Sequence, residues 1–149
     1  MPVLRLVLDE RKKWRAALKN RGFFLCVDGV YIKGGKILLL KRRVEPFKGR
    51  WHLVGGHVEE NETLKEALRR EFKEETNLDV EVGKILDGRI ENTFDRIKII
   101  VAFEVTNIQG EIKLNSESGA FGWFSEVPSN SVYDYSKYLT RKNNRARYG

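Results

Sequence analysis

The feature that most constrains this chain is an acidic run inside a strongly helical segment, residues 55–78, which read GGHVEENETLKEALRREFKEETNL. Thr63, with Glu66 three positions later, forms the pattern of a capping box, so we expect a helix to begin near Leu64. Asn77 tolerates the left-handed conformation that closes many helices, so we expect the helix to end there. One well-delimited helix is therefore the firmest element that the sequence predicts.

The inward face of this helix changes character along its length. Successive residues rotate by about 100°, which places Glu74 and Glu75 within roughly 60° of Glu71. The apolar residues of the first turns lie on the same side: Leu64, Ala67 and Leu68. An ordinary amphipathic helix would keep this side apolar. The glutamates therefore extend the inward-facing row, and Arg70 can pair with one of them to fix its orientation.

Inward-facing carboxylates need a partner. Two carboxylates 4 Å apart repel by about 4 kcal/mol at an effective dielectric constant of 20, and without partners they take up protons. Mg²⁺ resolves this conflict because it prefers oxygen ligands and commonly bridges carboxylates to phosphates. The helix therefore indicates a divalent metal site that serves phosphate chemistry.

The remaining sequence predicts strands and turns around this helix. We expect a leading helix over 9–21, strands over 23–33, 36–41, 51–54, 80–90, 97–106 and 121–124, and a terminal helix over 133–142. Gly34-Gly35 is a hairpin signal, Gly55-Gly56 indicates a second turn, and the tail over 143–149 is expected to fray. The predicted fold class is α/β or α+β, with a mixed sheet and helices.

Composition limits the alternatives. A chain of 149 residues with 41% hydrophobic and 33% charged residues fits a single globular domain over 1–149. Cys26 is the one cysteine, which fits a reducing compartment, so we expect a cytoplasmic protein. The apolar runs are too short to cross a membrane, and charged residues near the start argue against a secretory signal.

The chain is basic, with a formal net charge of +7 and basic clusters at residues 11–13, 41–43 and 141–147. These clusters are read either as a solvated surface or as a field that attracts polyanionic substrates. We do not expect nucleic acid as a partner, because the sequence carries no zinc pattern, RNA-binding aromatic motif or helix-turn-helix.

Residues 56–78 resemble the Nudix box, G-x5-E-x7-R-E-U-x-E-E-x-G-U, in which U is a bulky aliphatic residue. The matching positions are Gly56, Glu62, Arg70, Glu71, Glu74, Glu75 and Leu78. Phe72 stands in the first U position, and Asn77 replaces the final glycine, which is a mild departure because both residue types can close a helix. The resemblance implies the Nudix fold, a mixed β-sheet sandwiched between α-helices.

The resemblance also implies a hydrolase that uses Mg²⁺, or Mn²⁺ in its place, to activate water against a diphosphate. It implies that Glu71, Glu74 and Glu75 are metal ligands together with the carbonyl of Gly55, and that Arg70 orients a catalytic glutamate. Glu62 is expected to support this network or a further metal ion.

Other site residues are predicted less directly. Family members often place one more glutamate on a distal loop, and Glu117 stands in that region as a metal ligand or the catalytic base. The candidates for substrate binding are Gly56, His57, Arg43 and Trp51. For His57 the alternative is a structural hydrogen bond, and for Trp51 it is packing.

The favoured substrate is ADP-ribose or another nucleotide sugar, because the EPFKGRW sequence before the box resembles enzymes of that kind. Phe94 stands where many ADP-ribose enzymes carry a proline, which weakens this assignment. The alternatives are a house-cleaning hydrolase of (deoxy)nucleoside triphosphates and a non-catalytic nucleotide sensor. In each case the expected partner is a small nucleotide, with no membrane; a homodimer is left open.

Overall fold

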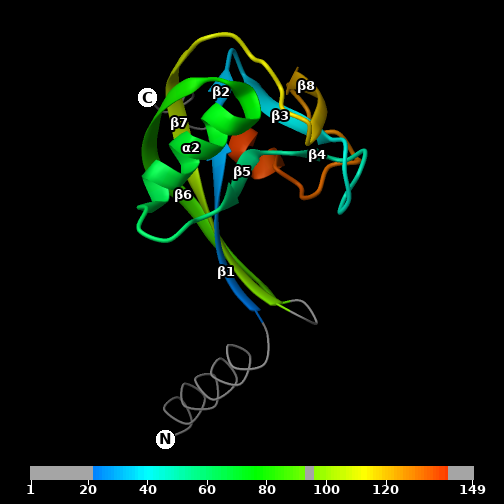
Figure 1. Cartoon of the computed structure of the whole chain (residues 1–149). Helices are drawn as coiled ribbons and strands as arrows, with labels where there is room; N and C mark the ends of the chain where they lie inside the picture. The colour runs from blue at the N-terminus through cyan, green and yellow to red at the C-terminus, as the bar shows by residue number, and fades with distance from the viewer. Residues whose placement is uncertain (1–21, 93–95, 141–149) are drawn as a thin grey trace, which may run out of the picture.

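The computed structural model describes residues 22–92 and 96–140, which form two four-stranded sheets and one long helix (Figure 1). The elements are β1 (Gly22–Val30), β2 (Ile32–Lys33), β3 (Lys36–Arg42), β4 (Trp51–His52), β5 (Val54–His57), α2 (Leu64–Thr76), β6 (Asp79–Asn92), β7 (Arg96–Gln109) and β8 (Ser118–Phe124). The predicted leading helix over 9–21, Phe94 and the tail over 143–149 lie outside the described residues.

The first sheet is mixed and runs in the order β5-β1-β7-β6. β1 pairs parallel with β7 and antiparallel with β5, while β6 pairs antiparallel with β7. β6 and β7 each span 14 residues, longer than the sequence predicted, and Figure 1 shows them extending beyond the body of the fold beside β1. This long sheet provides the surface on which a site can be built.

The second sheet is centred on β3, which pairs with β2, β4 and β8. Gly34 and Gly35 turn the chain between β2 and β3 with φ values of 60° and 74°, which glycine adopts without the steric cost of a Cβ. The predicted hairpin is therefore confirmed. A loop over 43–50, which contains Pro46, joins β3 to β4.

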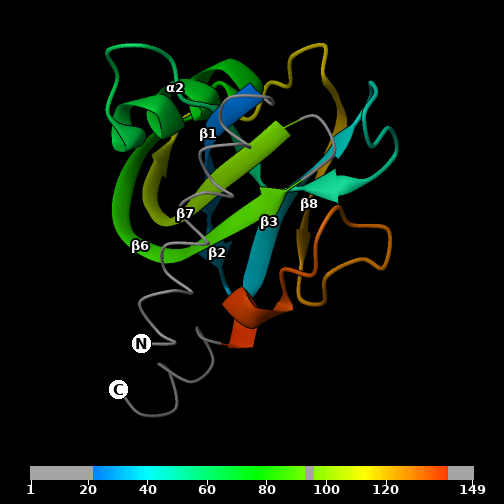
Figure 2. The same cartoon turned by 90° about the horizontal axis from the view of Figure 1, so that it is seen from below.

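Two apolar cores lie on the two faces of the sheets. Ala67, Leu68 and Phe72 of α2 are fully buried in one core. Tyr135 and Tyr138 anchor the other, next to a helical stretch over 136–140. Figure 2 shows α2 and this stretch on opposite sides of the sheets. The predicted α+β fold, with a mixed sheet between helices, is thus confirmed, although Tyr133 precedes the terminal helix instead of beginning it.

The long helix has the predicted ends. Thr63 and Glu66 form a complete capping box, with the Thr63 side chain accepting from the Glu66 backbone and the Glu66 side chain accepting from the Thr63 backbone. Asn77 closes the helix with φ 67° in the left-handed region. No helix in the described ranges is long and apolar enough to cross a membrane.

The glycine pair before the helix was predicted wrongly as a turn. Gly55 and Gly56 lie inside β5 and pair with Asp28 and Val27 of β1. Their role is close approach: a Cβ on Gly55 would come within 2.1 Å of the Val27 carbonyl oxygen, and one on Gly56 within 2.4 Å of the Glu71 carboxylate. The absence of side chains here lets the acidic end of α2 approach the edge of the first sheet.

Candidate active site

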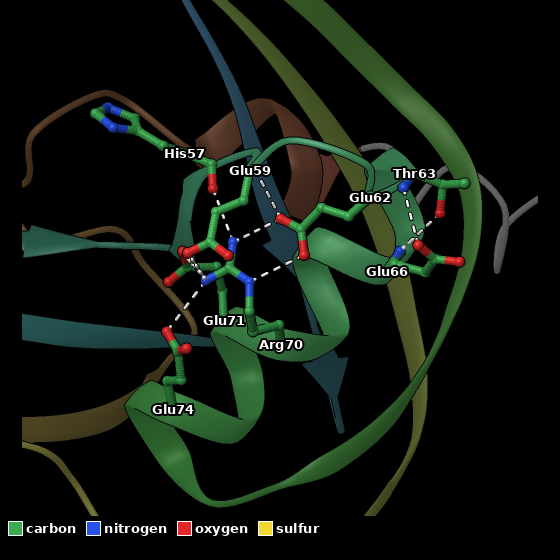
Figure 3. A network of polar contacts seen from close by, with 8 residues as sticks. All are labelled: His57, Glu59, Glu62, Thr63, Glu66, Arg70, Glu71 and Glu74. Carbon is green, nitrogen blue, oxygen red and sulfur yellow. Dashed lines mark hydrogen bonds and ion pairs between the residues drawn. The ribbon is translucent and has the colours of Figure 1, made fainter.

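Arg70 organises the acidic side of α2 (Figure 3). Its Nε and Nη2 atoms donate to the two oxygens of Glu62 at 3.0 and 2.7 Å. Its Nη1 donates to Glu71 at 3.0 Å and to Glu74 at 3.2 Å, and Nη2 also reaches the His57 carbonyl at 2.9 Å. The bond from Arg70 lowers the pKa of Glu62. Glu62 therefore fixes the guanidinium, which in turn holds two of the predicted metal ligands.

Burial disfavours the charged forms of two glutamates of the helix, the buried Glu75 and the half-buried Glu71. Glu75 is 4% exposed and accepts a hydrogen bond from the Gly55 backbone at 3.1 Å. Burial, reinforced by the neighbouring Glu71 carboxylate, raises the pKa of Glu75 well above its ordinary value. Burial also raises the pKa of Glu71 to about 7, against the opposing effect of Arg70. Both side chains thus face inward as predicted.

Glu74 and Glu117 are more accessible. The Glu74 side chain is 55% exposed, so it faces inward less than the periodicity predicted. Glu117 lies in the loop before β8, and its charge contributes to the raised pKa of Glu71 and Glu75, which places it near them in space. An Asx turn holds the loop, in which Asn115 Oδ1 accepts from the Glu117 backbone at 3.0 Å.

The donor set suits a hard divalent cation. It consists of carboxylate oxygens, and the raised pKa values of Glu71 and Glu75 reflect charge that a cation would stabilise. Among residues 22–92 and 96–140, no group of three or more Asp, Glu, His or Cys side chains is already arranged to coordinate a metal ion. The hydrogen bonds account for this, because Arg70 holds Glu71 and Glu74 while Glu75 turns to Gly55. Glu71, Glu74 and Glu75 would hold such a cation, and Glu74 is the most exposed of the three.

A cavity of about 470 Å³ opens beside these acids. Its lining contains most of the predicted site residues: Gly55, Gly56, His57, Arg70, Glu71, Glu74, Glu75 and Glu117. The fold therefore brings residues that lie far apart in the sequence to the lining of one cavity. A cavity of this size can enclose part of a nucleotide.

Arg43 and Trp51 are not among the residues that line this cavity. The Arg43 backbone donates to the Glu117 carbonyl at 2.8 Å, so this residue supports the Glu117 loop. The Trp51 ring packs edge-on against Phe124 at a centroid distance of 4.8 Å. Its carbonyl accepts from Val132 at 2.8 Å, which fixes the chain that leads into the second core.

The histidines and the cysteine of the cavity are held in uncharged forms. Burial lowers the pKa of His57, whose ring stacks on Phe24 at 4.9 Å. Burial also lowers the pKa of His52, and its Nδ1 lies 2.7 Å from the Leu53 carbonyl oxygen. The thiol of Cys26 has its pKa raised to about 11 by burial, so it is a poor nucleophile at neutral pH. These properties favour water as the attacking group.

The sequence reasoning missed the wall opposite the glutamates. Asp28 of β1, Arg89 of β6, Lys98 of β7 and Tyr133 all line the cavity. Asp28 was the available signal, because a carboxylate in the middle of an otherwise apolar strand needs a partner or a function. Arg89 gave no comparable signal, since its strand alternates charged and apolar residues along its length.

The profile of the NUDIX domain matches residues 24–141, most of the chain. The chain belongs to the Nudix family. It is therefore a Nudix hydrolase, an enzyme of a class that needs a divalent metal ion and acts on nucleotide derivatives. The resemblance drawn from the box is confirmed, including the substitution of Asn77 for the last glycine.

Similar proteins extend the family assignment. The chain is 41% identical to an ADP-ribose pyrophosphatase of Methanocaldococcus jannaschii over 86% of its own length and 76% of the relative's. It is 31% identical to the nucleoside triphosphatase NudI of Escherichia coli, over 68% and 78% of the two chains. The crystal structure of a MutT NUDIX hydrolase from Burkholderia pseudomallei matches the fold with a TM-score of 0.73 and 23% identity, over 80% and 98%.

Proposed function

We propose that this Nudix hydrolase cleaves the diphosphate of ADP-ribose or another nucleotide sugar with Mg²⁺ as its metal. The convergence of Glu71, Glu74, Glu75 and Glu117 on one cavity is the observation that carries the reaction. Support for the substrate comes from the relative that is named as an ADP-ribose pyrophosphatase, at 41% identity. Mn²⁺ can replace Mg²⁺, because it too accepts oxygen ligands.

The carboxylates of Glu71, Glu74 and Glu75 would hold the metal together with the Gly55 carbonyl. When bound, the ion activates a water molecule and neutralises charge on the phosphate oxygens. Arg70 would keep Glu71 and Glu62 oriented, since its planar guanidinium has donors for both. This division of roles explains why one arginine sits among so many acids.

Glu117 would supply a further carboxylate from the opposite loop, as a metal ligand or as the base that takes the proton of the attacking water. His57 and Gly56 line the cavity and would contact the substrate phosphates. Neutral His57 offers a ring nitrogen as a donor, and the bare backbone of Gly56 allows close approach. The reaction consumes one water and yields a nucleoside monophosphate, AMP in the case of ADP-ribose, and a sugar phosphate.

The second candidate is hydrolysis of (deoxy)nucleoside triphosphates. The similarity to the nucleoside triphosphatase NudI favours it, at 31% identity. Both candidate reactions would use the same metal-binding residues. Their substrates differ in the group attached beyond the cleaved diphosphate. That group is a sugar in the first case and a phosphate in the second.

A substrate screen tests the proposal. The purified full chain is incubated with ADP-ribose, other nucleotide sugars, dinucleotides and nucleoside triphosphates, each with Mg²⁺, with Mn²⁺ and with excess chelator. We expect nucleotide sugars to give the highest kcat/KM and the chelator to abolish turnover. A preference for triphosphates would replace the first candidate by the second, and the absence of turnover on every substrate would leave only a sensor.

We further propose a cytoplasmic enzyme consisting of one domain over 1–149. The single cysteine supports a reducing compartment. A homodimer is an open alternative to a monomer, and light scattering of the purified protein distinguishes the two. The solution mass is expected to be either 17.3 kDa or twice that value.

A further inference from the structure

The wall opposite the glutamates is one face of the first sheet. In the register of the strands, Arg89 of β6 pairs with Ile100 of β7, which pairs with Cys26 of β1. Asp28 lies two residues beyond Cys26 on β1, and so on the same face of the strand, opposite the small residue Ala102. Because Ala102 leaves room above the sheet, the Arg89 side chain can extend across β7 toward Asp28.

The Arg89 guanidinium lies close to two carboxylates and one aromatic ring, but two of its nitrogen atoms make no hydrogen bond with the residues that the structure describes. Its Nη2 lies 3.6 Å from an Asp28 oxygen, and its Nε lies 3.5 Å from Glu91. Its centre stacks 3.8 Å from the centroid of the Tyr133 ring, which fixes the plane of the group. Its Nε and Nη2 atoms are buried, and neither finds a hydrogen-bond partner among the described residues. Buried donors without acceptors are costly. Both atoms are closed off from solvent as the side chain stands, so a ligand would reach them once the partly exposed Arg89 side chain turns toward the cavity.

Charge balance limits what that ligand can be. Asp28, Arg89 and Lys98 line the cavity. Glu91 does not line it, but it lies directly opposite Lys98 in the sheet and close to Arg89, so it offsets the second positive charge. The wall therefore has no positive excess with which to bind a phosphate. It does present donors on Arg89 and acceptors on Asp28. A hydroxyl group both donates and accepts, so a polyhydroxylated, uncharged group matches the wall best.

The aromatic ring argues against a nucleobase at this position. Stacking of a base requires a free ring face, and the guanidinium of Arg89 occupies one face of Tyr133. The other large aromatic of this region, Tyr135, is only 2% exposed. The exposed aromatic ring among the residues that line the cavity is Phe47 of the loop between β3 and β4, so a base would stack there and not at Tyr133. A sugar needs only the polar groups of the wall.

We propose that Arg89 and Asp28 bind the hydroxyls of the sugar beyond the cleaved diphosphate and so select sugar diphosphates over nucleoside triphosphates. This inference rests on the proposed function, because it assigns the far group of that substrate to the far wall of the same cavity. Arg89 donates to the sugar oxygens, and Asp28 accepts from the sugar hydroxyls. Tyr133 acts as a positioning residue that holds the guanidinium.

The test compares two substrates that differ only in the sugar. The first is ADP-ribose, and the second is ADP carrying a methyl ester on its terminal phosphate, both with Mg²⁺. Arg89→Lys keeps the charge but loses the planar fork of donors. We expect it to lower kcat/KM for ADP-ribose about 30-fold, mainly through KM, and to change that of the methyl ester less than about 3-fold.

Matched variants separate binding from folding. Arg96→Lys is the arginine control, because the Arg96 guanidinium also lies over a ring, that of Phe24 at 5.1 Å, but does not line the cavity. Asp28→Asn is paired with Asp87→Asn, since Asp87 belongs to the same sheet but contacts Lys137 away from the cavity. We expect Asp28→Asn to reduce the preference for ADP-ribose about tenfold and both controls to leave it unchanged.

The outcomes are distinguishable. An equal loss on both substrates in Arg89→Lys, or no loss on either, would overturn the sugar subsite while leaving the proposed function intact. A larger loss on a nucleoside triphosphate than on ADP-ribose would assign the wall to phosphate instead. If the unmodified enzyme turns over triphosphates but not ADP-ribose, the proposed function fails first. Thermal melting checks that each variant is folded.

Discussion

On the α2 side of the cavity one arginine, Arg70, forms ion pairs with four glutamates. On the sheet side, formed by β1, β6 and β7, the two acids Asp28 and Glu91 lie beside the two basic residues Arg89 and Lys98. The first wall is left with excess negative charge that a cation must neutralise. The second is close to neutral at pH 7, because burial raises the pKa of Asp28 to about 6 and leaves it ionised there, and it has unused hydrogen-bonding capacity. The difference indicates a division of labour in which α2 supplies the reaction and the sheet supplies recognition.

Removing one carboxylate from α2 gives the largest expected effect. Glu75→Gln keeps the size of a buried side chain and its bond from Gly55 but removes a metal ligand. We expect kcat to fall about 1000-fold, since a bound metal contributes several kcal/mol to transition-state stabilisation. Steady-state kinetics at saturating Mg²⁺ measures this loss.

The matched control for this prediction is Glu81→Gln, on β6, where the exposed side chain bonds only to the amide of Asn107 among the contacts described. It should leave kcat within about 2-fold of the unmodified enzyme. Near-normal turnover in Glu75→Gln would contradict the metal assignment, and with it the contrast between the two walls.

The α2 wall could be predicted from sequence because its determinants are local. The capping box, the left-handed Asn77 and the spacing of Glu71 from Glu75 all lie within the single segment 63–77. Helical periodicity turns such spacing directly into a shared face. The exposure of Glu74 was the detail that periodicity could not provide, because it depends on how Arg70 packs.

The sheet wall could not be predicted in the same way. Arg89 and Asp28 meet only because β7 lies between β6 and β1 in a particular register, and register across distant strands is set by tertiary packing. The same limit explains the error at Gly55-Gly56. A glycine pair is a local turn signal, whereas here it serves the approach of a helix that follows later in the chain.

The burial of Glu71 on α2 also predicts a pH effect on stability. The pKa of Glu71 is raised by burial to about 7 in the folded protein, so the native state binds a proton that the unfolded chain has released above pH 4.5. The contribution of Glu71 to the free energy of unfolding is therefore largest below pH 4.5, and it is lost as the pH rises through about 7. In chelator, we expect the free energy of unfolding to fall by on the order of 2 kcal/mol over this range.

Urea unfolding at a series of pH values measures this effect. Glu71→Gln should remove the Glu71 contribution, so the variant should lose less stability between pH 5 and 8 than the unmodified protein. Added Mg²⁺ should reduce the loss in the unmodified protein at pH 8, because it neutralises the same carboxylates. Parallel pH curves for the two proteins would show that Glu71 carries no unfavourable charge.

The smallest effect concerns the geometry that lets α2 reach the cavity. Gly56→Ala would place a Cβ within 2.4 Å of the Glu71 carboxylate, so the flexible glutamate must move aside while the β5 backbone stays paired. We expect kcat to fall about tenfold with little change in melting temperature, because the displaced group is a side-chain end. Gly119→Ala is the control, since its nearest neighbour would be 3.8 Å away, at the Arg43 Cβ. If both alanine variants retain full activity, close approach at Gly56 is unnecessary for catalysis; if Gly56→Ala instead raises KM for ADP-ribose alone, the edge of β5 belongs with the recognition wall.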